Sequence, residues 1–360
     1  MLYPTSIQTC LSNLEYKRYA RHIVLENIGI SGQKRLKTAK ILFIGAGGLA
    51  ASSIIYLASS GIGYLGIIDY DQVSYSNLHR QILYNDKDVN KLKVDVVLDK
   101  VKEINIDCSI SIYAYMFNEN NCLDIIKNYD IVIDTSDNFK TRYIISQVCY
   151  LQHKVHIYAA VQGFEGQVSV FNYKSGILYS DLYPETLQLQ NRNCDNLGVL
   201  GILTGIVGML QATEAIKIIL GLGTSLSGYL LIYNALNSSF KKIKIKPKLI
   251  KYIPNNYYIN QLKESNTINS KKLFNTLNKD SIILLDVRQP EEFCIQHLYK
   301  AINIPLKSIN SKTTIKFIRD YLAHRKIVVY CYDNLRSIIA SKNFCIKNQL
   351  KSLSFRLLII

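Results

Sequence analysis

Three glycines and one acidic residue form the first pattern in this chain that can do chemistry. Gly45, Gly47 and Gly48 follow the apolar run 41–44, and Asp69 ends a second apolar run. Gly45 and Gly47 allow the backbone to turn tightly and approach a phosphate, while the N-terminus of the following helix offers N–H groups to the anion. Asp69 can hold a ribose hydroxyl. The pattern predicts a nucleotide site built on strand, turn, helix and strand.

The segment after the second strand decides which nucleotide is bound, because a G-x-G-x-x-A turn also fits nicotinamide-dependent dehydrogenases. Residues 69–81 read D-Y-D-Q-V-S-Y-S-N-L-H-R-Q. This segment resembles the D-x-D-x-V-x-x-S-N-L-x-R-Q segment of the adenylating enzymes that activate ubiquitin-like proteins. The resemblance implies an ATP site to which Asp71, Ser76, Asn77 and Arg80 contribute.

Two later segments match the same family in chain order. In 90–94, N-K-L-K-V, Lys93 maps to the family's phosphate-contacting lysine at the start of a helix. Residues 134–138, D-T-S-D-N, are similar to the family's D-x-x-D-N, which implies nucleotide contacts for Ser136, Asp137 and Asn138. Asp137 would hold Mg²⁺, a hard ion that takes carboxylate and phosphate oxygens. Alternatively, Asp137 and Asn138 cap the next helix.

The N-terminal segment 18–22, R-Y-A-R-H, resembles the R-Y-x-R opening of the family. There the second arginine reaches the triphosphate held by the other subunit. The resemblance implies this role for Arg21, and with it a homodimer with composite sites. A solvated basic helix face is the alternative.

Cysteine usage separates this chain from many members of the family. Cys194 falls on the family's reactive cysteine, which implies an acyl thioester, in a loop before an apolar helix expected at 199–220. Many relatives also carry two C-x-x-C pairs that bind structural zinc. The corresponding segments here, 178–181 and 256–259, read L-Y-S-D and N-Y-Y-I. We therefore expect no structural zinc.

The C-terminal part resembles a rhodanese-like sulfurtransferase domain. Residues 282–288 read as a buried strand ending in D-V-R, and 331–337, C-Y-D-N-L-R-S, match the family's C-x-x-G-x-R-S loop except at Asn334. The resemblance implies a persulfide on Cys331, stabilised by loop N–H groups and Arg336. The last ten residues do not match the family's ending.

These segments define the expected fold class and domains. We predict an α/β protein with a Rossmann-like adenylating domain and a mainly parallel sheet at 1–250. A polar linker at 251–270 follows, and then a smaller α/β rhodanese-like domain at 271–360, which matches its family incompletely at the end. Alternation in 242–246, K-I-K-I-K, predicts an edge strand with isoleucines inward and lysines outward. A docking patch for an acidic carrier protein is the alternative.

Composition limits the class and location of the protein. The 360 residues are 48% hydrophobic, without an uninterrupted membrane-length apolar run or a secretory signal, so we expect a soluble protein that does not bind membranes. The net charge of +16 comes mainly from lysine, in a chain rich in residues with AT-rich codons. We expect a plastid (chloroplast stroma) protein, or alternatively one of a bacterial-type cytoplasm. No nucleic-acid motif accompanies the lysines, so we expect no nucleic-acid partner.

Together the two regions most resemble molybdopterin-synthase adenylyltransferases that carry a rhodanese-like tail. The reaction implied is ATP-dependent adenylation of the C-terminal glycine carboxylate of a small ubiquitin-fold sulfur carrier. A thiamine or tRNA-thiolation carrier is one alternative, and a noncatalytic carrier-binding scaffold is another. A dehydrogenase would leave Arg80, Lys93 and Asp137 without a role.

Overall fold

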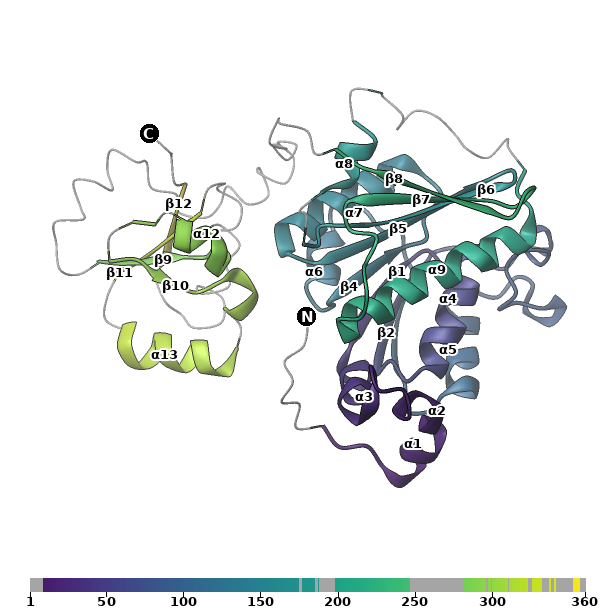
Figure 1. The fold of residues 1–360 in the computed structure, drawn as a ribbon, viewed down its shortest axis with the longest axis horizontal. Helices are drawn as coiled ribbons and strands as arrows, with labels where there is room; N and C mark the ends of the chain where they lie inside the picture. The colour runs from purple at the N-terminus through teal and green to yellow at the C-terminus, as the bar shows by residue number, and fades with distance from the viewer. Residues whose placement is uncertain are drawn as a thin grey trace. The chain divides into compact units, whose positions relative to one another are not determined.

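The computed structural model describes residues 9–174, 177–184, 187, 198–246 and 282–356, the last range with gaps at 296, 299, 310, 323–325, 332–336, 338–339 and 341–351. The chain divides into two compact units, with the boundary in the sequence after residue 249 (Figure 1). The predicted linker at 251–270 lies outside the described residues, as do Cys194, Asn334 and Arg336.

The first unit is organised around one sheet with strand order β3-β2-β1-β4-β5-β6-β7-β8. The strands are β1 (Lys40–Ile44), β2 (Tyr64–Ile68), β3 (Ser109–Tyr113), β4 (Ile131–Asp134), β5 (Val155–Gln162), β6 (Glu165–Phe171), β7 (Tyr229–Asn234) and β8 (Ser239–Lys244). Strands β3, β2, β1, β4 and β5 pair in parallel, whereas β6, β7 and β8 extend the sheet in antiparallel pairs. The order reverses between β1 and β4, which is where open α/β sheets bind ligands. The predicted Rossmann-like, mainly parallel sheet is confirmed.

Helices cover both faces of this sheet, which is why the apolar runs of β1 and β4 are buried. The helices are α1 (Asn13–Arg18), α2 (Ala20–Ile23), α3 (Gly29–Thr38), α4 (Gly48–Ser59), α5 (Lys93–Ile104), α6 (Cys122–Ile126), α7 (Phe139–Gln152), α8 (Tyr179–Leu182) and α9 (Gly201–Leu220), with short 3-10 turns η1 (Tyr75–Asn77) and η2 (Asp86–Asp88). Along β5, Ile157 and Ala159 join the main core, whereas Tyr158 joins a second, aromatic cluster with Tyr143 of α7. Period-two alternation thus divides β5 between two cores.

Helix α9 is the one described helix that is long and apolar enough to cross a membrane. It packs against α4, β5 and β6, and Leu203, Val207 and Ala215 are buried. A Cβ at Gly208 would lie 2.2 Å from the carbonyl oxygen of Leu49, so this glycine permits the close approach to α4. Most apolar residues of α9 therefore form part of the core, whereas Ile202 and Met209 are exposed.

Strand β8 forms the edge of the sheet, as the lysine alternation predicts, but its side chains do not divide as expected. All residues of β8 are exposed, and Ile243 retains 38% of its surface. Ile245, just beyond the strand, is buried in the aromatic cluster. The expected inward position is wrong for Ile243, because the aromatic cluster covers Leu230 and Ile245 but leaves Ile243 on the edge strand exposed.

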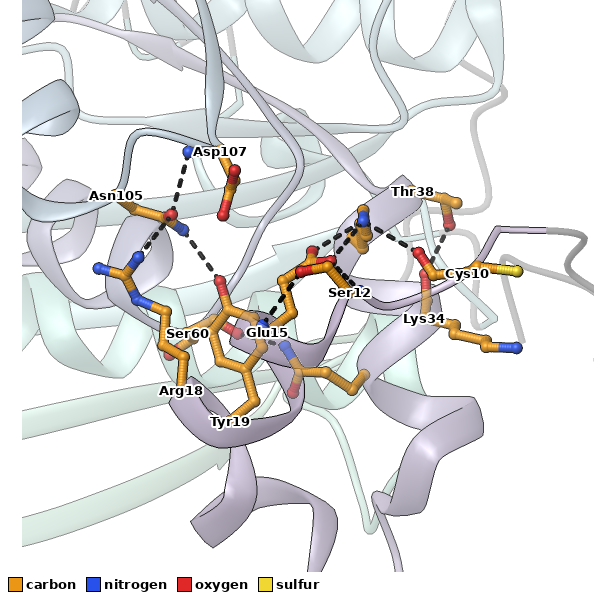
Figure 2. Close-up of polar contacts among 12 residues, drawn as sticks. Cys10, Ser12, Glu15, Arg18, Tyr19, Lys34, Thr38, Ser60, Asn105 and Asp107 are labelled. Carbon is orange, nitrogen blue, oxygen red and sulfur yellow. Dashed lines mark hydrogen bonds and ion pairs between the residues drawn. The ribbon is translucent and has the colours of Figure 1, made fainter.

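The N-terminal helices are fixed by two polar clusters (Figure 2). Ser12 and Glu15 form a reciprocal capping box at the start of α1, and Lys37 of α3 contacts the Glu15 carboxylate at 2.7 Å. Asn105, just after α5, accepts a hydrogen bond from Arg18 at 3.2 Å and donates one to the Tyr19 hydroxyl at 3.0 Å. Contacts with α3 and with Asn105 therefore hold α1 and α2 in place within the first unit.

The second unit is a parallel four-stranded sheet with strand order β10-β9-β11-β12. Its elements are β9 (Ile282–Asp286), α12 (Pro290–Ile295), β10 (Ile302–Asn303), η5 (Leu306–Ser308), α13 (Lys312–Leu322), β11 (Lys326–Cys331) and β12 (Ser352–Arg356). Arg288 and Asp286 form a fully buried ion pair at 2.6 Å. The C-terminal ten residues, which match no expected ending, supply β12.

Candidate nucleotide site

The glycine turn between β1 and α4 forms the floor of the site. Gly45 has φ of +101°, a conformation that L side chains rarely adopt, and a Cβ there would lie 2.9 Å from the carbonyl oxygen of Thr135. Thr135 in turn donates its hydroxyl to the carbonyls of Ile44 and Gly45. The turn is therefore joined to the end of β4 as well as to its own strand.

The two glycines that follow have different surroundings. A Cβ at Gly47 would meet only the side-chain nitrogen of Gln81, at 3.8 Å, so the backbone there faces open space. A Cβ at Gly48 would lie 2.9 Å from the hydroxyl of Thr204 on α9. Gly47 leaves room for a phosphate, whereas Gly48 is required by the packing of α4 on α9.

Asp69 ties the glycine turn to the end of β2. One carboxylate oxygen accepts the N–H of Ala46 at 2.7 Å and the other accepts that of Asp71 at 2.8 Å. Burial raises the pKa of Asp69 above its ordinary value, although Lys93 and the two N–H groups oppose this rise. The side chain lies at the carboxyl end of β2, where a ribose hydroxyl can reach it, and it also shapes the turn.

Lys93 is the first residue of α5, and its side chain points back to the end of β2. Its ammonium group lies 2.8 Å from the carboxylate of Asp71, and its N–H donates to the Asp71 carbonyl. The antiparallel bridge between Gln72 and Leu92 brings these two segments together. The Lys93 side chain is only 6% exposed, whereas that of Asp71 is 48% exposed, so Asp71 holds the lysine and still faces solvent.

Arg80 follows the 3-10 turn η1, which the Asn77 side chain closes by accepting the N–H of Ser74. The Arg80 guanidinium is half-buried and donates to the carbonyl of Ser76 at 2.9 Å. Thr204 of α9 donates its hydroxyl to the Arg80 carbonyl at 3.2 Å. The arginine is thus placed by its own turn and by the start of α9.

Asp137 lies beyond β4, with an exposed carboxylate. The pKa of Tyr70, which follows β2, is raised first by the charge of Asp71, then by burial, and then by the charges of Asp137 and Asp69. Asn138 caps α7 by accepting the N–H of Thr141, as the alternative interpretation expected. The Ser136 hydroxyl is buried and donates to Asp134 at 2.6 Å, so it is engaged within the protein.

Comparison with known protein families agrees with this arrangement of strand ends, glycine turn and basic side chains. The ThiF family pattern matches residues 19–251. The chain belongs to the ThiF family. A rhodanese-like domain matches residues 270–355, as the second predicted domain requires.

Curated relatives of this ThiF chain span nearly its whole length. The probable molybdopterin-synthase adenylyltransferase of the red alga Gracilaria tenuistipitata is 62% identical over 92% of this chain and 94% of the relative. The probable adenylyltransferase/sulfurtransferase MoeZ of Mycobacterium tuberculosis is 36% identical over 91% of this chain and 88% of the relative. The ThiF chain is an enzyme of this adenylyltransferase class, as the sequence predicts.

A solved structure supports the fold of the ThiF unit. The structure of E. coli MccB with ATP superposes with a TM-score of 0.55 at 22% identity, covering 67% of this chain and 74% of that chain. This likeness concerns the fold alone. The nucleotide contacts of individual residues in the ThiF unit stay predictions.

Three predicted site residues lie away from the glycine turn or outside the described residues. Arg21 is exposed on α2, and none of the ion pairs among the described residues includes it. Cys194 is outside the described residues. Cys331 ends β11 and is fully buried. The carboxyl end of a parallel strand is a common place for a residue that contacts a ligand. The buried Cys331 thiol, however, is not accessible to a ligand in this structure.

The structure adds site residues that sequence reasoning missed. Tyr84 donates its hydroxyl to the Ala46 carbonyl at 2.7 Å and so supports the glycine turn. Thr204 contacts the Arg80 segment, and Arg142 donates to the Ser136 carbonyl at 2.9 Å. Arg142 lies only five residues after Asp137, in D-N-F-K-T-R, so its closeness to the D-N motif could have indicated it. No local sequence pattern indicates Tyr84 or Thr204.

Proposed function

We propose that this protein adenylates the C-terminal glycine carboxylate of a small ubiquitin-fold sulfur carrier, with the molybdopterin-synthase small subunit as the substrate. Its product serves molybdenum cofactor biosynthesis. One observation carries the proposal: Asp69, which holds the glycine turn, and the Lys93–Asp71 ion pair lie at the end of β2, and Gln81, next to Arg80, approaches the turn at Gly47. The names of the relatives support the same reaction class.

The reaction requires two anions to meet. A carboxylate oxygen of the carrier attacks the α-phosphorus of ATP, the new C–O–P bond forms, and the bond to the β-phosphate oxygen breaks to release pyrophosphate. Arg80 and Lys93 offset the repulsion and stabilise the charge that moves to the leaving group. The open backbone at Gly47 accepts a phosphate, and Asp69 orients the ribose.

Magnesium fits the donor chemistry of this site. Asp137 offers an exposed carboxylate, and the neighbouring acids supply only oxygen ligands. No described group of three or more His, Cys, Asp or Glu side chains can hold a metal without the nucleotide. Asp137 would therefore hold Mg²⁺ together with phosphate oxygens, and the bound ion would neutralise phosphate charge.

Carrier-dependent exchange of labelled pyrophosphate into ATP tests this function. We expect exchange with the molybdopterin-synthase carrier and much less with thiamine or tRNA-thiolation carriers. Exchange with only a thiamine or tRNA-thiolation carrier would assign the protein to that carrier's pathway instead. Carrier binding without exchange would identify a noncatalytic scaffold, and tight NAD binding without exchange would favour a dehydrogenase.

We infer that the working unit is a homodimer in which Arg21 completes the site of the partner. Within one chain, α4 and α5 each begin at the site, and Tyr19 and Asn105 join α1 to their far ends (Figure 2). A helix of 12 residues is about 18 Å long, which separates Arg21 from the site of its own chain.

Mixed dimers test this arrangement. Arg21→Ala and Arg80→Ala each lose exchange alone, whereas a mixed dimer has one site with both arginines and recovers part of the activity. The expected recovery approaches a quarter of the wild-type rate for random pairing. No recovery in demonstrably mixed dimers would show that Arg21 does not act across subunits.

The remaining parts of the proposal concern sulfur and location. The rhodanese-like unit would supply sulfur to the adenylated carrier through a persulfide on Cys331, and Cys194 would form an acyl thioester. We place the protein in the plastid stroma, because its composition matches AT-rich coding and a close match comes from a red alga. Mass spectrometry of the carrier after reaction with a persulfide donor tests the sulfur step.

A further inference from the structure

A fully buried histidine and aspartate meet at the end of β4. His156 of β5 and Asp134 of β4 are both inaccessible, and the Nε2 atom of His156 lies 3.1 Å from one carboxylate oxygen of Asp134. Neither residue contacts the open part of the nucleotide site. Direct binding of ATP therefore does not explain why this pair is present.

The surroundings of the imidazole fix its tautomer. The Nδ1 atom of His156 has no hydrogen-bond partner, whereas Nε2 faces the carboxylate. A proton on Nδ1 would be a buried donor without an acceptor and would turn a lone pair toward the Asp134 oxygen. The proton therefore lies on Nε2, and His156 donates to Asp134.

The other oxygen of Asp134 holds the loop that carries Asp137. It accepts the Ser136 N–H at 3.0 Å and the Ser136 hydroxyl at 2.6 Å. The Ser136 carbonyl accepts from Arg142 at 2.9 Å, and the Asp134 carbonyl accepts from Gln211 of α9 at 2.8 Å. Every described bond here constrains the backbone immediately before Asp137.

Arg142 adds a buried positive charge to this network. Its guanidinium is buried between the rings of Phe139 and Tyr158, at 5.6 and 5.3 Å. Burial works to lower the pKa of Arg142, but neighbouring groups, Asp134 among them, outweigh burial and leave this pKa above its ordinary value. The Asp134 carboxylate holds Ser136 with one oxygen and accepts the bond from His156 with the other, so His156 helps to fix its orientation.

We propose that His156 is a positioning residue that, through Asp134 and Ser136, holds Asp137 where it binds the metal of the metal–ATP complex. The inference rests on the proposed function for the identity of the metal–nucleotide site. His156 itself touches neither metal nor nucleotide. Its role differs from general core packing because it donates to the Asp134 carboxylate, whose other oxygen holds Ser136 in the loop before Asp137.

Two substitutions and one control separate positioning from packing. His156→Leu removes the donor, His156→Gln restores an N–H donor near the Nε2 position, and Ser169→Ala removes another buried hydrogen bond of the same sheet, from Ser169 to the Tyr229 carbonyl. Binding of Mn²⁺ with ATP is measured by the electron paramagnetic resonance of the free ion. ATP binding without metal and the Mg²⁺ concentration for half-maximal pyrophosphate exchange are measured in parallel.

We expect His156→Leu to weaken binding of the Mn²⁺–ATP complex by about tenfold or more, the usual effect of losing a group that orients a metal ligand. Its binding of metal-free ATP should stay unchanged, and its Mg²⁺ requirement should rise. His156→Gln should recover most of the metal-dependent binding, and Ser169→Ala should match the wild type. Unchanged Mn²⁺–ATP binding in folded His156→Leu, or equal weakening with and without metal, would overturn the proposal.

Ser136→Ala poses the same question from the loop if His156→Leu fails to fold. It removes the hydroxyl bond to Asp134, and normal metal-dependent binding in this variant would also overturn the proposal. Wild-type protein that binds Mn²⁺–ATP but catalyses no exchange with any carrier would refute the proposed function and leave this inference standing. Wild-type protein that binds no Mn²⁺–ATP would refute both.

Discussion

At the scale of single residues, Lys93 and Lys91 differ in surroundings although both are lysines at the start of α5. Lys93 is almost fully buried and paired with Asp71, whereas Lys91 is 56% exposed and paired with Asp88. Only the first lies at the strand ends that form the site. The contrast supplies a matched pair of substitutions.

Lys93→Ala and Arg80→Ala should each reduce pyrophosphate exchange by about a hundredfold or more, because a lost transition-state charge contact costs on the order of 3 kcal/mol. Lys91→Ala should stay within about twofold of the wild type, because its exposed ion pair contributes little. Exchange kinetics are compared after circular dichroism confirms folding. Near-normal exchange by Lys93→Ala would remove that residue from the mechanism.

The adjacent glycines allow a second prediction at this scale. Gly48→Ala should lower stability by about 1–3 kcal/mol, because its Cβ would crowd Thr204. Gly47→Ala has room for its methyl group and an ordinary φ of −84°, so its melting temperature should change little. Its affinity for ATP should fall, because the methyl group occupies the space left for a phosphate.

Thermal unfolding and ATP titration of both variants distinguish the two roles. A Gly47→Ala protein that binds ATP normally would show that no phosphate approaches this turn. A Gly48→Ala protein as stable as the wild type would show that α4 and α9 adjust without cost.

At the scale of elements, sequence patterns predicted the elements but not all of the contacts between them. Apolar runs bounded by glycine or acidic residues correctly predicted β1, β2 and β4, because both faces of these strands are buried. The surroundings of Gly48 and Ile243 could not be predicted from their local sequence. Thr204 of α9 lies against Gly48, and Ile243 is exposed on the edge strand beside buried Leu230. The His156–Asp134 pair was also missed, because it forms between neighbouring strands rather than within a motif.

The capping box of α1 gives a pH-dependent prediction. Burial works to raise the pKa of Glu15, but hydrogen bonds from Lys37 and Ser12 outweigh it, and this pKa lies below its ordinary value. A lowered folded-state pKa stabilises the fold above the unfolded pKa, and this stabilisation is lost as the pH falls through the folded pKa. Glu15→Gln should therefore reduce the free energy of unfolding by about 1 kcal/mol at pH 7.

The difference between wild type and Glu15→Gln should close as the pH falls below about 4. Chemical denaturation across this pH range measures it. Glu103→Gln is the control, because Glu103 pairs with Lys100 at an exposed site and its loss should cost little at any pH. A constant difference from pH 7 to pH 3 would contradict the role of the Glu15 charge.

At the scale of the whole molecule, the two steps that we propose for the two units are chemically separate. Adenylation needs charge and positioning around ATP, whereas sulfur transfer needs a nucleophile. Cys331→Ala should therefore retain pyrophosphate exchange and lose sulfur transfer from a persulfide donor. Because Cys331 is buried, its modification by a thiol reagent should be much slower than that of Cys294, which is exposed on α12.

Mass spectrometry of the intact protein locates the persulfide, and Cys294→Ala serves as the control for nonspecific modification. Sulfur transfer that survives Cys331→Ala would assign the step to another cysteine. Loss of exchange in Cys331→Ala would show that the two steps are coupled.

The position of β1 has a consequence for synthesis of the chain on the ribosome. Ile41 pairs with Leu65 of β2 on one side but with Ile131 of β4 on the other, so the second neighbour emerges about 90 residues later. Translation at roughly 5–20 residues per second leaves that edge of β1 uncovered for several seconds. The surface of α4 that packs against α9 stays exposed for longer, until α9 has been synthesised. We therefore expect the nascent chain to need chaperones that shield apolar strands until the second half of the sheet has been made.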